Sequence, residues 1–335
     1  MTHSPIFIVG CPRSGKTLLR DLLRSHPHLT FPSESHFAVD FYQAYGDPRN
    51  EDEARRLAGK LLKLRSVRSL DLQLEPSAFA NDRSCREVMS RIYEAWALKQ
   101  NKPRWGNESP RHVRNLPALL EIFPAAKIIH VYRDGRDVAL DWLKHLFGPH
   151  NLFTAARGWK TLVSAGRQAG AKLPPETYLE VGYESLVGDP VTTMKRVCAF
   201  LDEPFTEAVL RPNRSVRRRR GSPAAHRLIF GRQEFETLPS EIVPGNAGTW
   251  KRAMPASDRI LFESVAGDLL DALGYETEGV TRRITMPERF LWRAHNLLGW
   301  FLRRLNTTGK RQLLRDSLSQ KWRAFCYRRR ARARR

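Results

Sequence analysis

The chain has 335 residues, of which 41% are hydrophobic and 10% aromatic. A chain of this length and composition can bury a large core, which excludes a disordered or collagen-like protein and a small disulfide-stapled one. The formal net charge is +22. Residues 282–335 carry +15 of this charge, because they contain 17 basic and 2 acidic residues.

The N-terminus lacks the features of an export signal, because no basic segment precedes the apolar stretch 6–9 and that stretch is too short. No apolar run reaches the roughly 18 residues that a membrane-spanning helix requires. The cysteines are Cys11, Cys85, Cys198 and Cys326, and they lack metal-ligand spacing. We therefore expect a cytoplasmic protein with neither a disulfide framework nor a metal site.

In chain order, predicted strands and helices alternate. Residues 6–9 predict a buried strand, and apolar side chains recur at helical spacing after residue 17. Residues 51–65 and 77–99 are helix-like with no strand between them, which indicates a helical insertion. The other predicted elements are strands at 29–31, 127–132 and 178–181, helices at 35–45, 190–202 and 257–273, and a long loop at 211–250. Strands that alternate with helices predict an α/β fold around a parallel sheet.

Residues 10–17, Gly-Cys-Pro-Arg-Ser-Gly-Lys-Thr, match the phosphate-loop pattern G-x-x-x-x-G-K-[ST]. Glycines let the backbone curl so that successive N–H groups converge on a phosphate, and the following helix adds the positive end of its dipole. The strand predicted before the loop and the helix predicted after it are the context that this motif requires. We therefore predict a phosphate site here.

A second phosphate site is predicted at Arg133, which follows the strand 127–132. A nucleoside triphosphatase needs an acid at the end of such a strand to hold Mg²⁺, whereas an arginine binds phosphate through paired, charge-assisted hydrogen bonds. Two phosphate sites without a clear metal-binding carboxylate favour a nucleotide phosphorylated at two places. Lys16 and Thr17 leave an ATP-dependent P-loop kinase or NTPase as the alternative.

Further motifs lie in order along residues 5–275, at 7–15, 25–27, 32–37, 132–140, 181–186 and 248–251. Together they resemble those of bacterial PAPS-dependent sulfotransferases. The resemblance implies a three-layer α/β fold of the P-loop type with a central parallel sheet. It suggests a sulfotransferase domain at 1–280, with the helical insertion at about 50–100, and leaves a basic helical C-terminal tail at 281–335.

The resemblance also implies sulfonate transfer from PAPS to a hydroxyl group, with PAP as the product and no metal. It gives Arg13 the support of the leaving phosphate and Arg133 the 3′-phosphate. Sulfonate transfer is mainly in-line positioning and stabilisation of spreading charge, which Arg13 and Lys16 can provide. The expected donor-binding residues are Arg13, Ser14, Gly15, Lys16, Thr17, Leu18, Arg133, Asp141, Tyr183, Trp250 and Lys251.

Three positions depart from the family pattern. Lys16 stands where the family more often has Thr, Asp141 where it usually has Ser, and Glu108 where it commonly has Lys. A carboxylate beside a phosphate is repulsive unless it turns away or pairs with an arginine. We interpret these positions as a specialised or weakened donor site. A degenerate sulfotransferase fold used as a basic scaffold is the non-enzymatic alternative.

A base is needed to take the proton of the acceptor hydroxyl. Glu34 is the first candidate, because it follows a short strand and should lie near the phosphate loop, where ligands collect in open α/β sheets. Related sulfotransferases place a catalytic Glu in this region. Glu108 is the second candidate and His36 the third. The acceptor, a glycan, lipid, peptide or small metabolite, and the oligomeric state stay open.

The tail predicts a basic amphipathic helix over residues 289–305, with leucine and phenylalanine side chains opposite a polar face. That polar face holds Arg289, Arg293, Asn296, Arg303 and Arg304. The pattern is typical of a helix lying in the interface of an anionic membrane, here its inner face. A helix packed on the catalytic domain is the alternative. Nucleic-acid binding is disfavoured, because no base-reading module is recognised.

Overall fold

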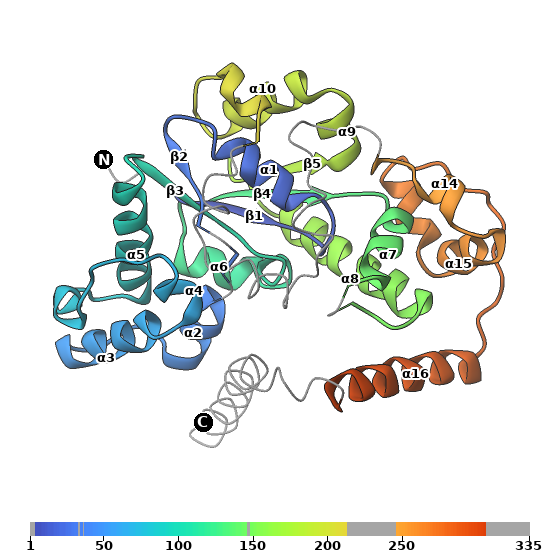
Figure 1. The fold of residues 1–335 in the computed structure, drawn as a ribbon, viewed down its shortest axis with the longest axis horizontal. Coiled ribbons are helices and arrows are strands. Elements are labelled where there is room, and N and C mark those ends of the chain that lie inside the picture. The colour runs from blue at the N-terminus through green and yellow to red at the C-terminus, as the bar shows by residue number, and fades with distance from the viewer. Residues whose placement is uncertain (1–3, 33, 36, 146–147, 213–245, 306–335) are drawn as a thin grey trace.

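The computed structural model describes residues 4–32, 34–35, 37–145, 148–212 and 246–305 (Figure 1). Its strands are β1 (Ile6–Val9), β2 (Leu29–Thr30), β3 (Arg104–Glu108), β4 (Lys127–Tyr132) and β5 (Tyr178–Gly182). The helices before β4 are α1 (Lys16–Leu23), α2 (Phe37–Tyr45), α3 (Glu51–Leu62), α4 (Arg65–Arg68), η1 (Pro76–Phe79), α5 (Cys85–Lys99), η2 (His112–Arg114) and α6 (Leu116–Ile122). The later ones are α7 (Gly135–Leu143), α8 (Leu152–Gly170), α9 (Tyr183–Gly188), α10 (Pro190–Phe200), η3 (Glu207–Leu210), α14 (Trp250–Ala253), α15 (Ala256–Ala272) and α16 (Met286–Leu305).

The strands all run parallel, in the order β2-β3-β1-β4-β5. β1 lies in the middle, where Phe7 stands opposite Asn107 of β3 on one side and Ile128 of β4 on the other. This arrangement confirms the predicted α/β fold with a central parallel sheet. Because the strands are parallel, the segments that follow β1, β3 and β4 emerge together at one edge, the usual place for a ligand.

Helices cover both faces of the sheet, so the fold has three layers (Figure 1). Along β1 the side chains alternate: Ile6 and Ile8 pack with residues of α1, α9 and α10, whereas Phe7 and Val9 pack with residues of α6 and α8. All four side chains are fully buried. A strand that is apolar at every position is what a parallel sheet covered on both faces requires.

The predicted helical insertion lies between β2 and β3 and comprises α3, α4, η1 and α5. Asn50 and Ser84 cap α3 and α5, each by accepting a hydrogen bond from a backbone N–H of the first turn. The helix predicted at 77–99 begins only at Cys85, because Ser84 has extended backbone and the short helix η1 ends before it.

β3 was not predicted, because its sequence Arg-Trp-Gly-Asn-Glu has no apolar run, yet all its residues are buried. The charged ends of the strand find partners that are distant in the sequence. Nε of Arg104 donates to the carbonyl oxygen of Ser4 at 2.7 Å, and its Nη1 pairs with Glu203 at 3.1 Å. Nη1 of Arg20 donates to Glu108 at 2.7 Å. These contacts offset the cost of burying charge, so a polar segment can lie between β2 and β1.

The predicted tail helix is present as α16, which begins at Met286 rather than at residue 289. The carboxylate of Glu288 accepts a hydrogen bond from the backbone N–H of Thr285 at 2.9 Å, and this capping contact starts the helix earlier. Residues 306–335 and most of the loop predicted at 211–250 lie outside the described residues.

α16 packs along α8. The ring of Trp292 lies 4.9 Å from that of Phe153, and Nδ2 of Asn151 donates to the carbonyl oxygen of Trp292 at 2.8 Å. The side chain of Asn296 accepts a hydrogen bond from the backbone N–H of His150 at 2.8 Å. Within the described residues, no helix is both long and apolar enough to cross a membrane.

Candidate active site

The phosphate loop joins the end of β1 to the first turn of α1 at the carboxyl edge of the sheet. Gly10 has a φ of 144°, and a Cβ there would lie 2.2 Å from the carbonyl oxygen of Val131. Gly15 has a φ of 91°, and a Cβ there would lie 2.3 Å from the ring of Tyr183. Any side chain at either position would clash and strain the backbone, so the loop follows this course only with glycine.

Arg13 also has left-handed backbone, with a φ of 70°, a conformation that clusters at functional turns. Ser14 is fully buried, and its hydroxyl has no hydrogen-bond partner in the described part of the chain. Thr17 and Leu18 lie in the first turn of α1. The N-cap of this helix is Gly15, which has no side chain to accept hydrogen bonds from the N–H groups of that turn. The loop therefore offers N–H and O–H donors to a phosphate.

Lys16 crosses the phosphate loop. Its side chain is buried, and Nζ donates to the carbonyl oxygen of Cys11 at 2.7 Å. Burial raises the pKa of the Cys11 thiol to about 12, against the lowering effect of the Lys16 charge. The thiol is therefore protonated at neutral pH and cannot act as a thiolate nucleophile.

Arg133 leaves the end of β4 and lies against the loop. Its Nη1 donates to the carbonyl oxygen of Arg13 at 3.3 Å and to Oδ2 of Asp141 at 2.8 Å. Its guanidinium group lies 4.7 Å from the centre of the Tyr183 ring. Its Nη2 donates to the carbonyl oxygen of Asn246 at 2.6 Å. The structure thus brings together four of the residues that were predicted to bind the donor.

Two further predicted donor-binding residues, Trp250 and Lys251, lie outside the phosphate loop in a segment that is hydrogen-bonded to α7. The buried carboxylate of Asp137 accepts hydrogen bonds from the backbone N–H groups of Gly248 at 2.8 Å and of Trp250 at 2.7 Å. The buried ring of Trp250 lies 3.5 Å from the guanidinium of Arg136. Lys251 is exposed and pairs with a carboxylate on the surface. Trp250 therefore packs in the core, and Lys251 lies at its rim.

Glu34 lies between β2 and α2, next to a residue that β3 and α5 hold in place. Oγ of Ser35 accepts a hydrogen bond from Nδ2 of Asn107 at 2.5 Å and lies 2.8 Å from the hydroxyl of Tyr93. Glu34 keeps contact with solvent, yet the protein packed around its carboxyl group raises its pKa to about 7, and the charge of Glu108 adds to the rise. Such a carboxylate suits a general base near neutral pH.

Glu108 ends β3 at the same edge and is buried, with its Oε2 accepting the hydrogen bond from Arg20. Arg20 also pairs with Asp21 at 2.9 Å, so the guanidinium bridges two carboxylates. The carboxylate of Glu108 therefore takes part in a buried ion pair with Arg20. The third candidate, His36, lies outside the described residues.

Three residues of this site were not predicted: Arg20, Tyr93 and Asn107. Arg20 follows Lys16 by one turn of α1, and that spacing was a signal for a second cation on the same side of the helix. Asn107 adjoins the predicted Glu108, but it contacts Tyr93 from a distant helix, and nothing in the sequence indicates that contact.

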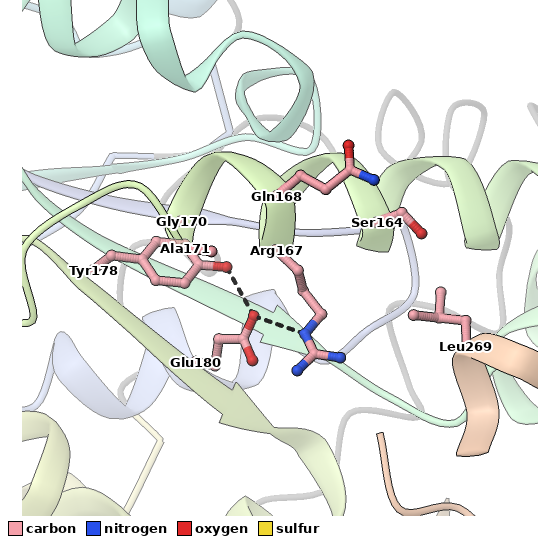
Figure 2. Close-up of a pocket in the computed structure, with 8 residues that line it drawn as sticks. All are labelled: Ser164, Arg167, Gln168, Gly170, Ala171, Tyr178, Glu180 and Leu269. Carbon is pink, nitrogen blue, oxygen red and sulfur yellow. Dashed lines mark hydrogen bonds and ion pairs between the residues drawn. The ribbon is translucent and has the colours of Figure 1, made fainter. Parts of the chain in front are cut away.

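Two other features lie toward the opposite edge of the sheet. Next to the start of β2, His26, His28 and Glu203 place possible ligand atoms within 4.8 Å of one another, which could hold a metal ion. Between α8 and β5 an open cavity of about 460 Å³ is lined by Tyr178, Glu180 and Arg167, among others (Figure 2). Neither feature includes a residue of the phosphate loop.

Comparison with known proteins identifies the family of this chain over a region that includes the phosphate loop. The model of the sulfotransferase family matches residues 5–207. This chain therefore belongs to the sulfotransferase family.

Two curated relatives carry tyrosine, the acceptor residue, in their names. A protein-tyrosine sulfotransferase of Drosophila melanogaster is 25% identical over 224 residues, which are 65% of this chain and 42% of that protein. Protein-tyrosine sulfotransferase 1 of Danio rerio is 29% identical over 220 residues, which are 61% of this chain and 55% of that protein. The chain thus spans about half the length of the curated relatives that it matches.

Solved structures show the same fold. The sulfotransferase domain from the curacin biosynthetic pathway has a TM-score of 0.57 and 22% identity, and the match covers 82% of this chain and 99% of that one. The sulfotransferase domain of the Synechococcus PCC 7002 olefin synthase has a TM-score of 0.56 and 23% identity, and the match covers 82% and 96%. The predicted sulfotransferase fold is confirmed.

Proposed function

We propose that this chain transfers a sulfonate group from PAPS to a hydroxyl group and releases PAP. Membership of the sulfotransferase family supports the reaction class. The observation that carries the proposal is the position of Arg133, whose Nη1 donates to the carbonyl oxygen of Arg13 at 3.3 Å. A guanidinium group therefore stands directly beside the phosphate loop, which supports a nucleotide phosphorylated at its 5′ and 3′ positions.

In this proposal the loop holds the 5′-phosphosulfate through the N–H and hydroxyl groups of residues 14–18. Lys16, whose Nζ already crosses the loop to Cys11, would exchange that carbonyl for a phosphate oxygen. Arg13 would neutralise the charge that develops on the leaving phosphate. Two cations at the leaving group supply the stabilisation that a bound metal gives other enzymes, so the proposed reaction requires no metal.

Glu34 is the proposed general base, which accepts the proton of the acceptor hydroxyl as the S–O bond forms. Its pKa of about 7 leaves a useful fraction of the carboxylate ionised at neutral pH and makes it a stronger base than an ordinary glutamate. Ser35, fixed by its contacts to Asn107 and Tyr93, positions the segment that carries Glu34.

The test is product formation from PAPS in the presence of EDTA, with ATP and Mg²⁺ as the competing donor. The proposal predicts unchanged turnover with PAPS in EDTA and none with ATP. Turnover with ATP that EDTA abolishes would instead support the P-loop kinase, which the Lys16 and Thr17 pair suggests. Absence of PAP binding to the folded chain, measured by calorimetry at high micromolar nucleotide, would support the degenerate scaffold.

The acceptor is proposed by class. The relatives named protein-tyrosine sulfotransferases support a peptide tyrosine as the first acceptor to test. Peptides that contain tyrosine or phenylalanine at one position form a matched pair, because only the tyrosine has a hydroxyl. Glycan, lipid and small-metabolite hydroxyls belong in the same assay, which detects the mass of one added sulfonate.

We further propose that α16 docks the chain on an anionic membrane at its cytoplasmic face. Its exposed apolar side chains include Phe290, Leu291, Leu297, Leu298, Phe301 and Leu302. Partial desolvation lowers the pKa of Arg157 on α8, and the charges of Arg293 and Arg289 on α16 add to the effect, so three cations lie close together where the two helices meet. A helix with an exposed apolar face and cations on its other face suits the surface of an anionic membrane. The proposed division is a sulfotransferase domain at 1–280 and a basic tail at 281–335.

A further inference from the structure

The second phosphate site already contains an anionic side chain. Oδ2 of Asp141 accepts a hydrogen bond from Nη1 of Arg133 at 2.8 Å, and the Arg133 side chain is 6% exposed. A carboxylate and a phosphate present the same kind of acceptor oxygens to a guanidinium group. Asp141 therefore takes a position on Arg133 that a phosphate would also seek.

A second carboxylate, that of Asp137, adds another negative charge beside Arg133. Oδ2 of Asp137 lies 3.7 Å from Nη2 of Arg133, so one guanidinium faces two carboxylates. Asp137 is fully buried and accepts from Thr249 Oγ1 at 2.7 Å as well as from two backbone N–H groups, which hold it in place. The Asp141 side chain is 36% exposed, so it can rotate toward solvent.

Arg133 also has unused hydrogen-bonding capacity. Its Nε is buried and has no partner among the described residues. A buried donor without a partner is costly unless a ligand completes it. The guanidinium group is thus positioned for a further acceptor, but the carboxylates beside it repel a doubly charged one.

We propose that Asp141 sets the affinity for the donor's 3′-phosphate, because its carboxylate competes with that phosphate for Arg133. The inference rests on the proposed function, since it takes the nucleotide to lie on the phosphate loop. Phosphate binding then requires Asp141 to leave Arg133 and turn toward solvent. The chain should gain less from the 3′-phosphate than it would with an uncharged residue at position 141.

The experiment measures dissociation constants of PAP and of AMP, which lacks the 3′-phosphate, by calorimetry on the full chain. The ratio of the AMP constant to the PAP constant reports the contribution of the 3′-phosphate alone. For Asp141→Ser the ratio should rise on the order of tenfold over the unmodified chain, because one nearby negative charge is removed. Asp141→Asn, which keeps the shape of the side chain, should raise it as well.

The matched control is Asp268→Asn, which removes the same charge from an exposed residue of α15 that pairs with Lys160. Its ratio should equal that of the unmodified chain. Arg133→Ala should bring the ratio close to one, with or without Asp141→Ser. A melting curve for each variant shows whether the fold is intact.

The outcomes separate the two proposals. An unchanged ratio in both Asp141 variants, with PAP and AMP still bound, overturns the role of Asp141 and leaves the proposed function standing. Failure of the unmodified chain and of every folded variant to bind either nucleotide overturns the proposed function and this inference with it.

Discussion

Oε2 of Glu108 accepts a 2.7 Å hydrogen bond from Nη1 of Arg20, and both side chains are buried. The pair links the end of β3 to the helix that follows the phosphate loop. It also explains how a carboxylate can occupy a position where the family resemblance implies a lysine, because the compensating cation comes from α1. The negative charge of Glu108 then acts on Glu34, whose pKa it helps to raise.

Glu108→Gln should therefore shift the pH dependence of turnover. Glu34 works as a base only when ionised, so the rate falls as the pH drops through its pKa of about 7. Removing the charge of Glu108 lowers that pKa and moves the acid limb of the profile to lower pH. The profile of kcat against pH measures the shift.

Gln at position 108 can still accept the hydrogen bond from Arg20, so we expect the variant to fold, which a melting curve checks. An acid limb that stays at the same pH in a folded Glu108→Gln enzyme would mean that Glu108 does not influence the base.

Glu34→Gln should slow the chemical step by on the order of 10²–10⁴-fold, because general-base catalysis is lost. PAP affinity should change little, since Glu34 is not part of the phosphate loop. Single-turnover kinetics and PAP calorimetry measure the two quantities separately. An unaltered chemical rate would transfer the role of base to Glu108.

Arg13→Ala should lower turnover by on the order of 10²–10³-fold, which is typical for the loss of one group that stabilises transition-state charge. The fold should persist, because alanine tolerates the left-handed backbone of Arg13 about as well as arginine does. Steady-state rates and a melting curve test both statements. Full activity in this variant would remove Arg13 from the mechanism.

Gly15→Ala should destabilise the chain by about 1–3 kcal/mol and abolish nucleotide binding, because a Cβ would lie 2.3 Å from the Tyr183 ring on strained backbone. Gly188→Ala is the control, since a Cβ there meets nothing within 4 Å. Urea unfolding and PAP calorimetry compare the two variants. Equal behaviour of both would show that the loop tolerates a side chain at Gly15.

Leu297→Glu on α16 should weaken partitioning to vesicles with anionic lipid by at least about tenfold, through loss of buried apolar area and added negative charge. Leu98→Glu on α5 is the matched control, because Leu98 is an equally large residue that is also well exposed. Vesicle sedimentation measures both. Loss of nucleic-acid affinity instead, with vesicle binding unchanged, would assign α16 to a different partner.

Local signals in the sequence predicted much of this molecule. The strand at residues 6–9, the glycines of the loop and the helices of the insertion depend on neighbouring residues, so periodicity and motif spacing found them, although not the start of α5 at Cys85. β3 escaped prediction because its polar ends are compensated by Arg20 and Glu203, which are far away in the sequence. The contact of Asn107 with Tyr93 was missed for the same reason.

The pairing of Arg133 with Asp141 was anticipated only as one of two possibilities. Eight residues separate the two along the chain, and α7 carries Asp141 back to the end of β4. Whether the carboxylate turns toward the arginine depends on the side-chain geometry, which spacing alone does not determine. The structure shows it paired.

The most direct test of the account is a crystal structure of the chain with PAP. The account predicts the 5′-phosphate within the loop of residues 10–17, in contact with its backbone N–H groups, and the 3′-phosphate on the guanidinium group of Arg133. Adenine nucleotide bound elsewhere, with the loop unoccupied and Arg133 still paired to Asp141, would contradict it.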